Sequence, residues 1–309
     1  MTGEQMDRSP LTDDVLDAFA DIALATRGRV FGLRPGGHAS LSHGAGGAHA
    51  GLAPLLADPD PRRIDLRATL RDPFGTVWVR RQRQLAEIDV IALVDCSGSM
   101  GFHGRASRPE LVQHLVTGLA HAASRSSDRF GLVLAGADLR EPLCLPPSRR
   151  RDLAATVCAR IGAATPRGHG VDGMIAARDH LPGRRSVVLL VSDFAWPDRD
   201  LHRVLEALSH HDLRPLILGD SALDSPDPRP GLLDLADLET GRRRMVLMRP
   251  RLAAAWARAA HARRQRQDRI FAEHGLVPLL IRDQIDTDAL FDHLGSHLAP
   301  HLGSGGPGS

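Results

Sequence analysis

The stretch that decides the fold is Ile88–Ser99, which reads IDVIALVDCSGS. Its first seven residues, Ile88–Val94, are mostly apolar and predict a buried β-strand. Directly after the strand, Asp95, Ser97 and Ser99 place one carboxylate and two hydroxyls at alternate positions. A tight turn can fold three such side chains over one point, and hard oxygen atoms are the ligands that a small divalent cation such as Mg²⁺ prefers. The stretch therefore predicts a metal site at the end of a strand.

A second apolar run also ends in an acid. Residues 187–193 read VVLLVSD, so that Asp193 follows a predicted strand in the same way as Asp95 does. Open α/β sheets bind their ligands beyond the carboxyl ends of parallel strands. We therefore expect Asp193 to lie close to Asp95 and to be a further metal ligand.

The rest of the chain from residue 87 onward alternates apolar runs with segments of helical spacing, which predicts a doubly wound, mostly parallel α/β sheet. Further strands are expected at 129–135, 186–192, 213–218 and 277–281, and a hairpin at 232–248. Helices are expected at 109–124, 148–161, 171–181, 199–210, 251–274 and 287–298.

The residues before this core have a different character. We expect an amphipathic helix over 11–26, a Gly/His-rich loop over 36–51, and an alternating segment at 76–80 that adds an antiparallel strand to the edge of the main sheet. The predicted organisation is an N-terminal helical and loop extension packing on the core (1–86), the α/β domain (87–300) and a disordered tail (301–309).

Composition narrows the classes of function. The 309 residues carry 39 basic and 37 acidic side chains, a net charge of +2 that gives no overall attraction to nucleic acid or anionic lipid. The three cysteines are scattered and lack C-x-x-C spacing, which argues against a disulfide framework or a zinc site and suits a reducing compartment. No apolar run is long enough to span a bilayer, and Met1–Pro10 lacks a signal-peptide core. We expect a cytoplasmic protein without a nucleic-acid partner and without a membrane span.

The D-x-S-x-S spacing at a strand end resembles the metal-ion-dependent adhesion site of von Willebrand factor A (vWA) domains. Three further motifs follow the order of one bacterial family, namely RRIDLR at 62–67, SDF at 192–194 and LETG at 238–241. Over roughly residues 30 to 298 the chain resembles the family called domain of unknown function 58, vWA-like proteins typically encoded beside MoxR-type AAA+ ATPases. The resemblance implies a vWA or Rossmann-like fold.

The resemblance also implies a set of metal ligands. In vWA domains two serines and a threonine hold the cation, aspartates hold it directly or through water, and one position stays open for an acidic side chain of a partner. The matching residues here are Asp95, Ser97, Ser99 and Asp193.

The threonine of the vWA pattern has no direct match. The glycine-rich loop reads RGHGVD at 167–172, with Gly170 or Val171 at the position expected to be threonine. Thr165 is the candidate substitute, and the alternatives are Asp172 or no replacement at all.

Capping is a second reading of the same residues. Serines and aspartates at strand–helix junctions commonly cap the following turn, with the side-chain oxygen accepting a backbone N–H. The two acid-ended strands, together with the family resemblance, favour a metal site over capping alone.

Two functions compete. The resemblance implies a non-enzymatic adaptor that works with a MoxR-type AAA+ ATPase and docks on an acidic residue of a client complex, in maturation or metal-cofactor insertion such as that of methanol dehydrogenase. The alternative is a Mg²⁺-dependent phosphotransferase or phosphatase of the haloacid dehalogenase type with Asp95 as nucleophile. Such an enzyme needs a second aspartate two residues on and a lysine, whereas this chain has Ser97 at that position and no lysine.

Overall fold

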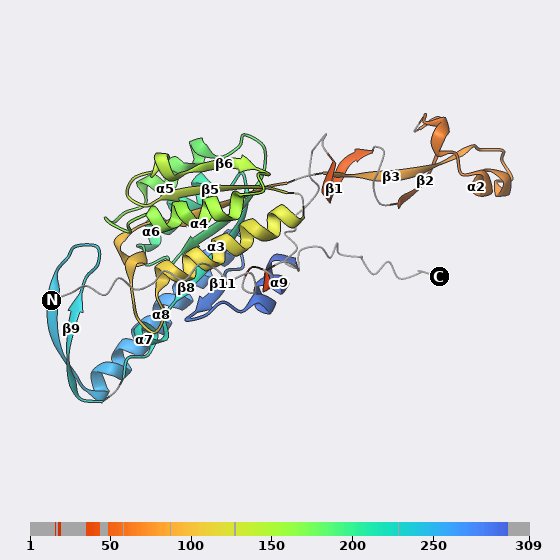
Figure 1. The fold of residues 1–309 in the computed structure, drawn as a ribbon. Coiled ribbons are helices and arrows are strands. Elements are labelled where there is room, and N and C mark those ends of the chain that lie inside the picture. The colour runs from red at the N-terminus through yellow and green to blue at the C-terminus, as the bar shows by residue number, and fades with distance from the viewer. Residues whose placement is uncertain are drawn as a thin grey trace, which may run out of the picture.

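The computed structural model describes residues 16, 18–19, 35–43, 49–57, 59–86, 88–126, 128–227 and 229–295. Within these residues a six-stranded sheet forms the centre of the fold (Figure 1). Its parallel strands, in spatial order, are β11 (Leu279–Arg282), β8 (Asp212–Gly219), β7 (Val187–Ser192), β4 (Asp89–Asp95) and β5 (Arg129–Ala135). The edge strand β6 (Leu145–Ser148) pairs antiparallel with β5. The predicted doubly wound, mostly parallel α/β sheet is confirmed.

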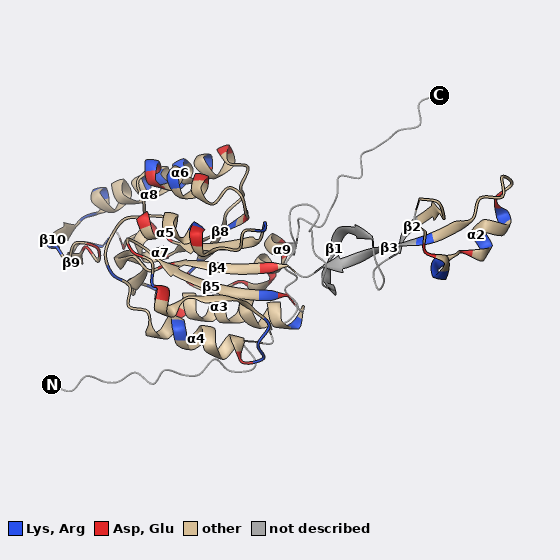
Figure 2. Cartoon of the chain, turned by 90° about the horizontal axis from the view of Figure 1, so that it is seen from above, with Lys and Arg blue, Asp and Glu red and all other residues tan. Residues whose placement is uncertain are grey.

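Helices cover the sheet on both sides because β4 is apolar on both faces. Val90, Ala92 and Val94 belong to one buried cluster, and Ile91 and Leu93 to another, as expected for side chains that alternate between the faces of a strand. The first cluster packs under α3 (Arg108–Arg125), α4 (Leu153–Ala163) and α9 (Thr287–Gly295). The second packs under α5 (Asp172–Ala176), α6 (Asp198–Ala207) and α8 (Pro250–Glu273). Figure 2 shows α3 and α4 on one side of β4 and β5, with α6 and α8 on the other.

Helix α3 begins at the edge of the sheet where the predicted metal loop lies. Ser107 precedes the helix, and its Oγ accepts a hydrogen bond from the Glu110 backbone N–H at 3.4 Å. Pro109 stands in the first turn, where its missing N–H costs nothing. These signals fix Arg108 as the first residue of α3, directly above the carboxyl ends of the strands.

Several predicted elements have different bounds in the structure. The helix expected at 148–161 begins only at Leu153, because residues 145–148 form the edge strand β6. The helix expected at 171–181 is divided into α5 and a 3₁₀ turn, η4 (Ala177–His180). The last predicted helix is described as far as Gly295. The hairpin expected at 232–248 is present as β9 (Gly231–Ala236) and β10 (Arg243–Met248).

The segments before the core form a separate small sheet. Strand β3 (Trp78–Ala86) pairs antiparallel with β1 (Pro35–His43) on one edge and with β2 (His49–Pro54) on the other. Two expectations were therefore wrong. Residues 76–80 lead into and begin β3, so they do not extend the main sheet. The Gly/His-rich segment at 36–51, expected to be a loop, contributes residues to β1 and β2 instead, because the backbone hydrogen bonds of a strand need no apolar side chains. In Figure 1, β2 and the short helix α2 (Leu66–Arg71) lie away from the six-stranded sheet.

Most of the helix expected over 11–26 and all of the tail at 301–309 lie outside the described residues. Phe19, which is described, is buried against α3 at Gly118, where any side chain would collide with the phenyl ring. The division of the chain after residue 86 stays a prediction. None of the helices in the described ranges combines the length and the hydropathy that a membrane crossing requires.

A pair of leucine substitutions tests this account of the core. Leu115 on α3 is 0% exposed, whereas Leu70 on α2 is 84% exposed. We expect Leu115→Ala to lower the free energy of unfolding by about 2–5 kcal/mol, because it leaves a cavity between α3 and the sheet. Leu70→Ala is the matched control and should change it by less than about 0.5 kcal/mol in urea denaturation. Equal effects of the two substitutions would contradict the described packing.

Candidate functional site

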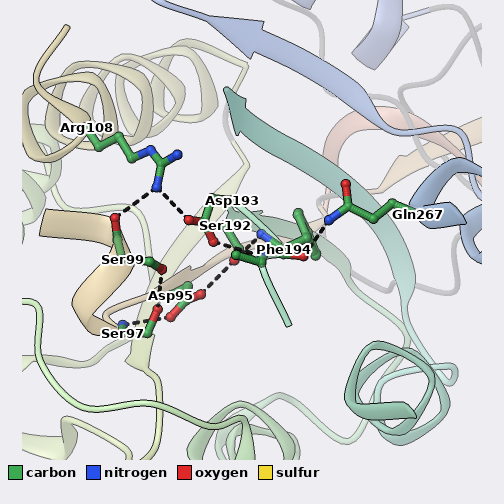
Figure 3. A network of polar contacts seen from close by, with 9 residues as sticks. Asp95, Ser97, Ser99, Arg108, Ser192, Asp193, Phe194 and Gln267 are labelled. Atoms are coloured by element: carbon green, nitrogen blue, oxygen red, sulfur yellow. Dashed lines mark hydrogen bonds and ion pairs between the residues drawn. The ribbon is translucent and has the colours of Figure 1, made fainter. Parts of the chain in front are cut away.

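The carboxyl ends of β4 and β7 meet through one hydrogen bond. Ser192 Oγ, at the end of β7, donates to Asp95 Oδ2, at the end of β4, at 2.6 Å (Figure 3). The two strands are neighbours in register, with Val94 opposite Val191, so the residues that follow them come out at the same edge. The predicted meeting of these two strand ends at one edge is therefore seen in the structure.

Both predicted serines lie in the turn after β4. Ser97 precedes the 3₁₀ turn η2 (Gly98–Gly101) and does not cap it through its side chain; instead its backbone N–H donates to Asp95 Oδ1 at 2.8 Å, so the capping side chain is that of Asp95. The hydroxyl oxygens of Ser97 and Ser99 lie 3.2 Å apart. One carboxylate and two hydroxyls thus gather at one point, and the capping interaction exists beside this gathering and does not exclude it.

The turn is fixed by its neighbours. The Gly98 backbone N–H donates to the Gly168 carbonyl at 2.8 Å, and the Arg167 N–H donates to the Cys96 carbonyl at 2.9 Å. At Gly98 a Cβ atom would collide with the Leu238 carbonyl oxygen, in the turn between β9 and β10. The glycine is therefore required by close approach of the hairpin, and the site loop is held between two other loops.

Asp193 follows β7 and is paired with an arginine that the sequence did not single out. Arg108 Nη1 donates to Asp193 Oδ2 at 2.5 Å and to the Ser99 carbonyl oxygen at 2.9 Å. The side chains of both charged residues are only 6% exposed. Asp193 Oδ1 accepts the Ala195 backbone N–H at 3.0 Å. A sequence signal existed: a cation in the first turn of a helix is opposed by the helix dipole and needs an acidic partner.

The segment after Asp193 is held in an uncommon conformation. Phe194 is fully buried with a φ of 49°, in the left-handed region that non-glycine residues rarely occupy. Its N–H donates to Ser192 Oγ at 2.9 Å, and its carbonyl accepts from Gln267 Nε2 of α8 at 2.5 Å. Its ring packs edge-on against Trp196 and Phe271. These contacts attach the end of β7 to α8 and fix the direction of the chain at Asp193.

Neither candidate for the missing threonine has a described hydrogen bond to the site. Thr165 is exposed in the loop after α4, and no described hydrogen bond joins it to the serine hydroxyls or the two carboxylates. Its role as a ligand stays a prediction. Asp172 forms an ion pair with Arg203 of α6 at 3.0 Å, so its carboxylate is engaged there. The glycine-rich loop reaches the site through its backbone, at Gly168.

Negative charge accumulates at this edge. Burial, and next the charge of Asp193, raise the pKa of the Asp95 carboxyl from 3.8 to about 6, although hydrogen bonds from Ser192 and Ser97 act in the opposite direction. Burial and the charge of Asp193 also raise the pKa of Glu239, in the turn of the hairpin. The charge of Asp193 therefore disfavours the charged forms of Asp95 and Glu239, and a cation among them would relieve this repulsion.

The residues present fit a small, hard cation. All candidate donors are oxygen atoms, and the 3.2 Å between the hydroxyls of Ser97 and Ser99 is close to the roughly 3 Å between neighbouring ligands of an octahedral Mg²⁺ ion. In the ranges that the structure describes, no group of three or more His, Cys, Asp or Glu side chains is arranged to hold a metal, so a cation here depends on the serine hydroxyls. This chemistry suits Mg²⁺ better than zinc.

A cavity of about 320 Å³ lies beside the site. Ser99, Arg108 and Asp193 line one part of it, and α8 and the turn of the β9–β10 hairpin line the rest. Ser99 and Asp193 are thus accessible to a group that enters between the hairpin and α8, whereas Asp95 and Ser97 do not line this cavity.

Comparison with known proteins gives a family and several relatives. The family described as "Protein of unknown function DUF58" matches residues 58–267. A Paracoccus denitrificans protein described as "Uncharacterized protein in moxR 3'region" is 46% identical over 101 residues, which are 33% of this chain and 96% of that protein. Among solved structures, the chain is similar to BatB from Bacteroides thetaiotaomicron, with 14% identity and a TM-score of 0.44 over 68% of this chain and 98% of that one. It is also similar to the SpRpn10 VWA domain, with 13% identity and a TM-score of 0.36 over 68% and 95% of the two chains.

The raised pKa of Asp95 predicts a pH dependence of stability. Because the folded state binds this proton more tightly than the unfolded state does, the stability of the cation-free protein should fall as pH rises from about 4 to about 6, by up to about 3 kcal/mol. Asp95→Asn should remove this part of the slope. The measurement is urea denaturation in EDTA at a series of pH values.

Asp200→Asn is the matched control, since Asp200 pairs with Arg203 on α6, away from the two strand ends. It should keep the wild-type slope between pH 4 and 6. A wild-type slope in Asp95→Asn would show that Asp95 is not the group that titrates.

Proposed function

Because this chain belongs to the DUF58 family, we propose that it is a non-enzymatic vWA-type adaptor that binds a protein partner through a metal-dependent site. The observation that carries the proposal is the junction of β4 and β7, where Asp95 and Asp193 follow strand ends joined by the Ser192 hydrogen bond, beside an accessible cavity. The ligands would be Asp95, Ser97, Ser99 and Asp193, with Thr165 as a further candidate. No turnover is required of such a site.

A bound Mg²⁺ ion would supply positive charge at an edge that is otherwise negative. The chain's own residues would position the ligands of this ion. Ser97 and Ser99 present their hydroxyls from a turn fixed at Gly98, and Asp95 is held by Ser192. A partner with an exposed acidic side chain, such as one on a client complex, suits a cavity that ends at such a cation.

One face of the β9–β10 hairpin beside the site carries three exposed apolar side chains next to the Arg243–Asp234 ion pair. Leu247 pairs with Leu232, and Met245 lies two residues before Leu247, so the three side chains share one face of the ribbon. All three are about half exposed or more. A contiguous exposed apolar surface commonly marks a site of protein–protein contact. We propose that the partner covers this face while its acidic group enters the cavity.

The proposed partner is a MoxR-type AAA+ ATPase. The support is the relative described as lying in the moxR 3' region, together with membership of the DUF58 family. In this role the adaptor would couple the ATPase to a client complex, in maturation or metal-cofactor insertion in the cytoplasm.

The alternative, a phosphotransferase of the haloacid dehalogenase type, is not supported. Its second aspartate is replaced by Ser97, and the chain has no lysine to neutralise a phosphoryl group. Asp95, its nucleophile, is buried and accepts hydrogen bonds at both carboxylate oxygens.

A capture experiment with a purified MoxR-type ATPase from the same organism tests the role of the cation. Wild-type protein should bind the ATPase in Mg²⁺ and at least about tenfold more weakly in EDTA, a loss of about 1.4 kcal/mol or more. Asp95→Asn should bind weakly in both conditions, because it removes a charged ligand and keeps the size of the side chain. Asp200→Asn should bind like the wild type. Capture that is equal in Mg²⁺ and EDTA would refute a cation-dependent contact.

A substitution on the hairpin tests the docking face. Leu247→Asp places a charge beside Leu232 and Met245 on this face and should weaken capture of the same ATPase by about tenfold or more, without changing the stability of the core. Leu70→Asp is the matched control, an exposed apolar residue on α2. If only Leu70→Asp weakened capture, the partner would bind at α2 and not at the hairpin.

A further inference from the structure

The Arg108–Asp193 pair has a consequence for the metal site, and it rests on the proposed function above. We propose that Arg108 is a built-in competitor for the divalent cation. Its guanidinium holds Asp193 in the cation-free protein and thereby lowers the affinity of the site for Mg²⁺, so that the site fills only when Asp193 leaves Arg108.

The first support is the position of the guanidinium. A single nitrogen, Nη1, donates both to Asp193 Oδ2 and to the Ser99 carbonyl (Figure 3). The hydroxyl of that same Ser99 is one of the two that lie 3.2 Å apart. Arg108 therefore binds two of the residues that would hold the cation, and it stands on the side of the site that faces the cavity.

The second support is that the charge of Asp193 is already compensated by Arg108. Oδ2 accepts from Arg108, and Oδ1 accepts the Ala195 backbone N–H. Each oxygen keeps a lone pair for a cation, as the oxygens of Asp95 do, but a cation bound to Asp193 lies next to the positively charged guanidinium of Arg108, which repels it. The bond to Arg108 is the one that carries charge, and a divalent cation supplies the same compensation to the carboxylate.

The third support is burial. Both side chains are 6% exposed, so neither charge is screened effectively by water, and each needs the other while no metal is present. Arg108 Nε is also buried without a hydrogen-bond partner, so the guanidinium is held by its Nη1 contacts and by the ring of Phe102, 5.3 Å from its centre. An arginine held in this way can leave Asp193 without breaking a larger network.

Isothermal titration calorimetry with Mg²⁺, repeated with Mn²⁺, tests the proposal on the full chain. Arg108→Gln should bind Mg²⁺ at least about tenfold more tightly than the wild type, a gain of about 1.4 kcal/mol. Arg105→Gln is the control matched for charge, since Arg105 is exposed in the same loop and its side chain has no described contact with Asp193. It should stay within about twofold of the wild type.

A double-mutant cycle identifies the carboxylate through which Arg108 acts. In the Asp193→Asn background, Arg108→Gln should change Mg²⁺ affinity by less than about twofold, because the group for which the two cations compete is gone. Circular dichroism shows whether each variant folds. If Arg108→Gln does not fold, Arg108→Lys replaces it: lysine is a point charge that cannot reproduce the planar geometry of the guanidinium, and the variant should have an affinity above that of the wild type.

The outcomes separate the inference from the proposed function. If the wild type and Arg108→Gln bind Mg²⁺ with measurable and equal affinities, Arg108 does not compete with the cation and the inference is overturned, although the metal site itself exists. A weaker affinity in Arg108→Gln would also overturn it, because Arg108 would then position Asp193 for the cation. An equal gain in Arg105→Gln would also overturn it, because the loss of any nearby positive charge would then explain the tighter binding of Mg²⁺. No binding in any variant would overturn both the inference and the metal-dependent function.

Discussion

The hydrogen bond from Ser192 to Asp95 is the contact on which the arrangement of the site depends. It joins the ends of two neighbouring parallel strands, and it does so with a carboxylate that is almost completely buried. A buried carboxylate is costly unless hydrogen bonds or positive charge stabilise it. Asp95 has two hydrogen bonds from the protein but no cationic partner among its described contacts, whereas Asp193 has Arg108. The edge is therefore left with more negative charge than its own side chains balance.

Capping and metal binding were competing readings of the same residues, and the geometry makes them compatible. Asp95 Oδ1 accepts the Ser97 N–H, and Asp193 Oδ1 accepts the Ala195 N–H, each two residues on. These short-range bonds orient each carboxylate before any ligand is present. A side chain that caps its own turn loses little further rotational freedom when it binds a cation, so capping prepares the site.

The sequence predicted the elements whose pattern is carried by side chains. The apolar runs ending at Asp95 and Asp193 identified two buried strands, and parallel pairing was enough to predict that their ends meet. The ordered motifs indicated the DUF58 family, which the match over residues 58–267 confirms. The small sheet of β1, β2 and β3 was missed because its Gly/His-rich strand is defined by backbone pairing and has no apolar alternation.

Contacts between segments far apart in the chain could not be predicted from the sequence either. The position of Arg108 in the first turn of a helix calls for an acidic partner, but nothing in the local sequence identifies that partner as Asp193, 85 residues later. Nothing relates Gln267 to the Phe194 carbonyl, 73 residues earlier. The vWA pattern takes a hydroxyl from the glycine-rich loop, which has no threonine here, and in the structure this loop meets the site through the Gly168 carbonyl. Loops follow no period, so their side-chain directions are set by tertiary contacts that a single sequence does not display.

The charge at this edge constrains what kind of partner the proposed adaptor can accept. Asp95, Asp193 and Glu239 would together repel the acidic group of a partner, and the pair with Arg108 already uses the nearest positive charge. Docking of an acidic side chain beside Asp193 is therefore favoured by an added cation or by the release of Arg108 from Asp193, while Arg263 and Arg264 supply positive charge elsewhere on the cavity wall. If the cation takes over Asp193, both positive charges become available on the same wall of the cavity. Binding of the cation and binding of the partner would then favour each other, because the positive charge of the cation and the negative charge of the partner's acidic group attract each other in the cavity.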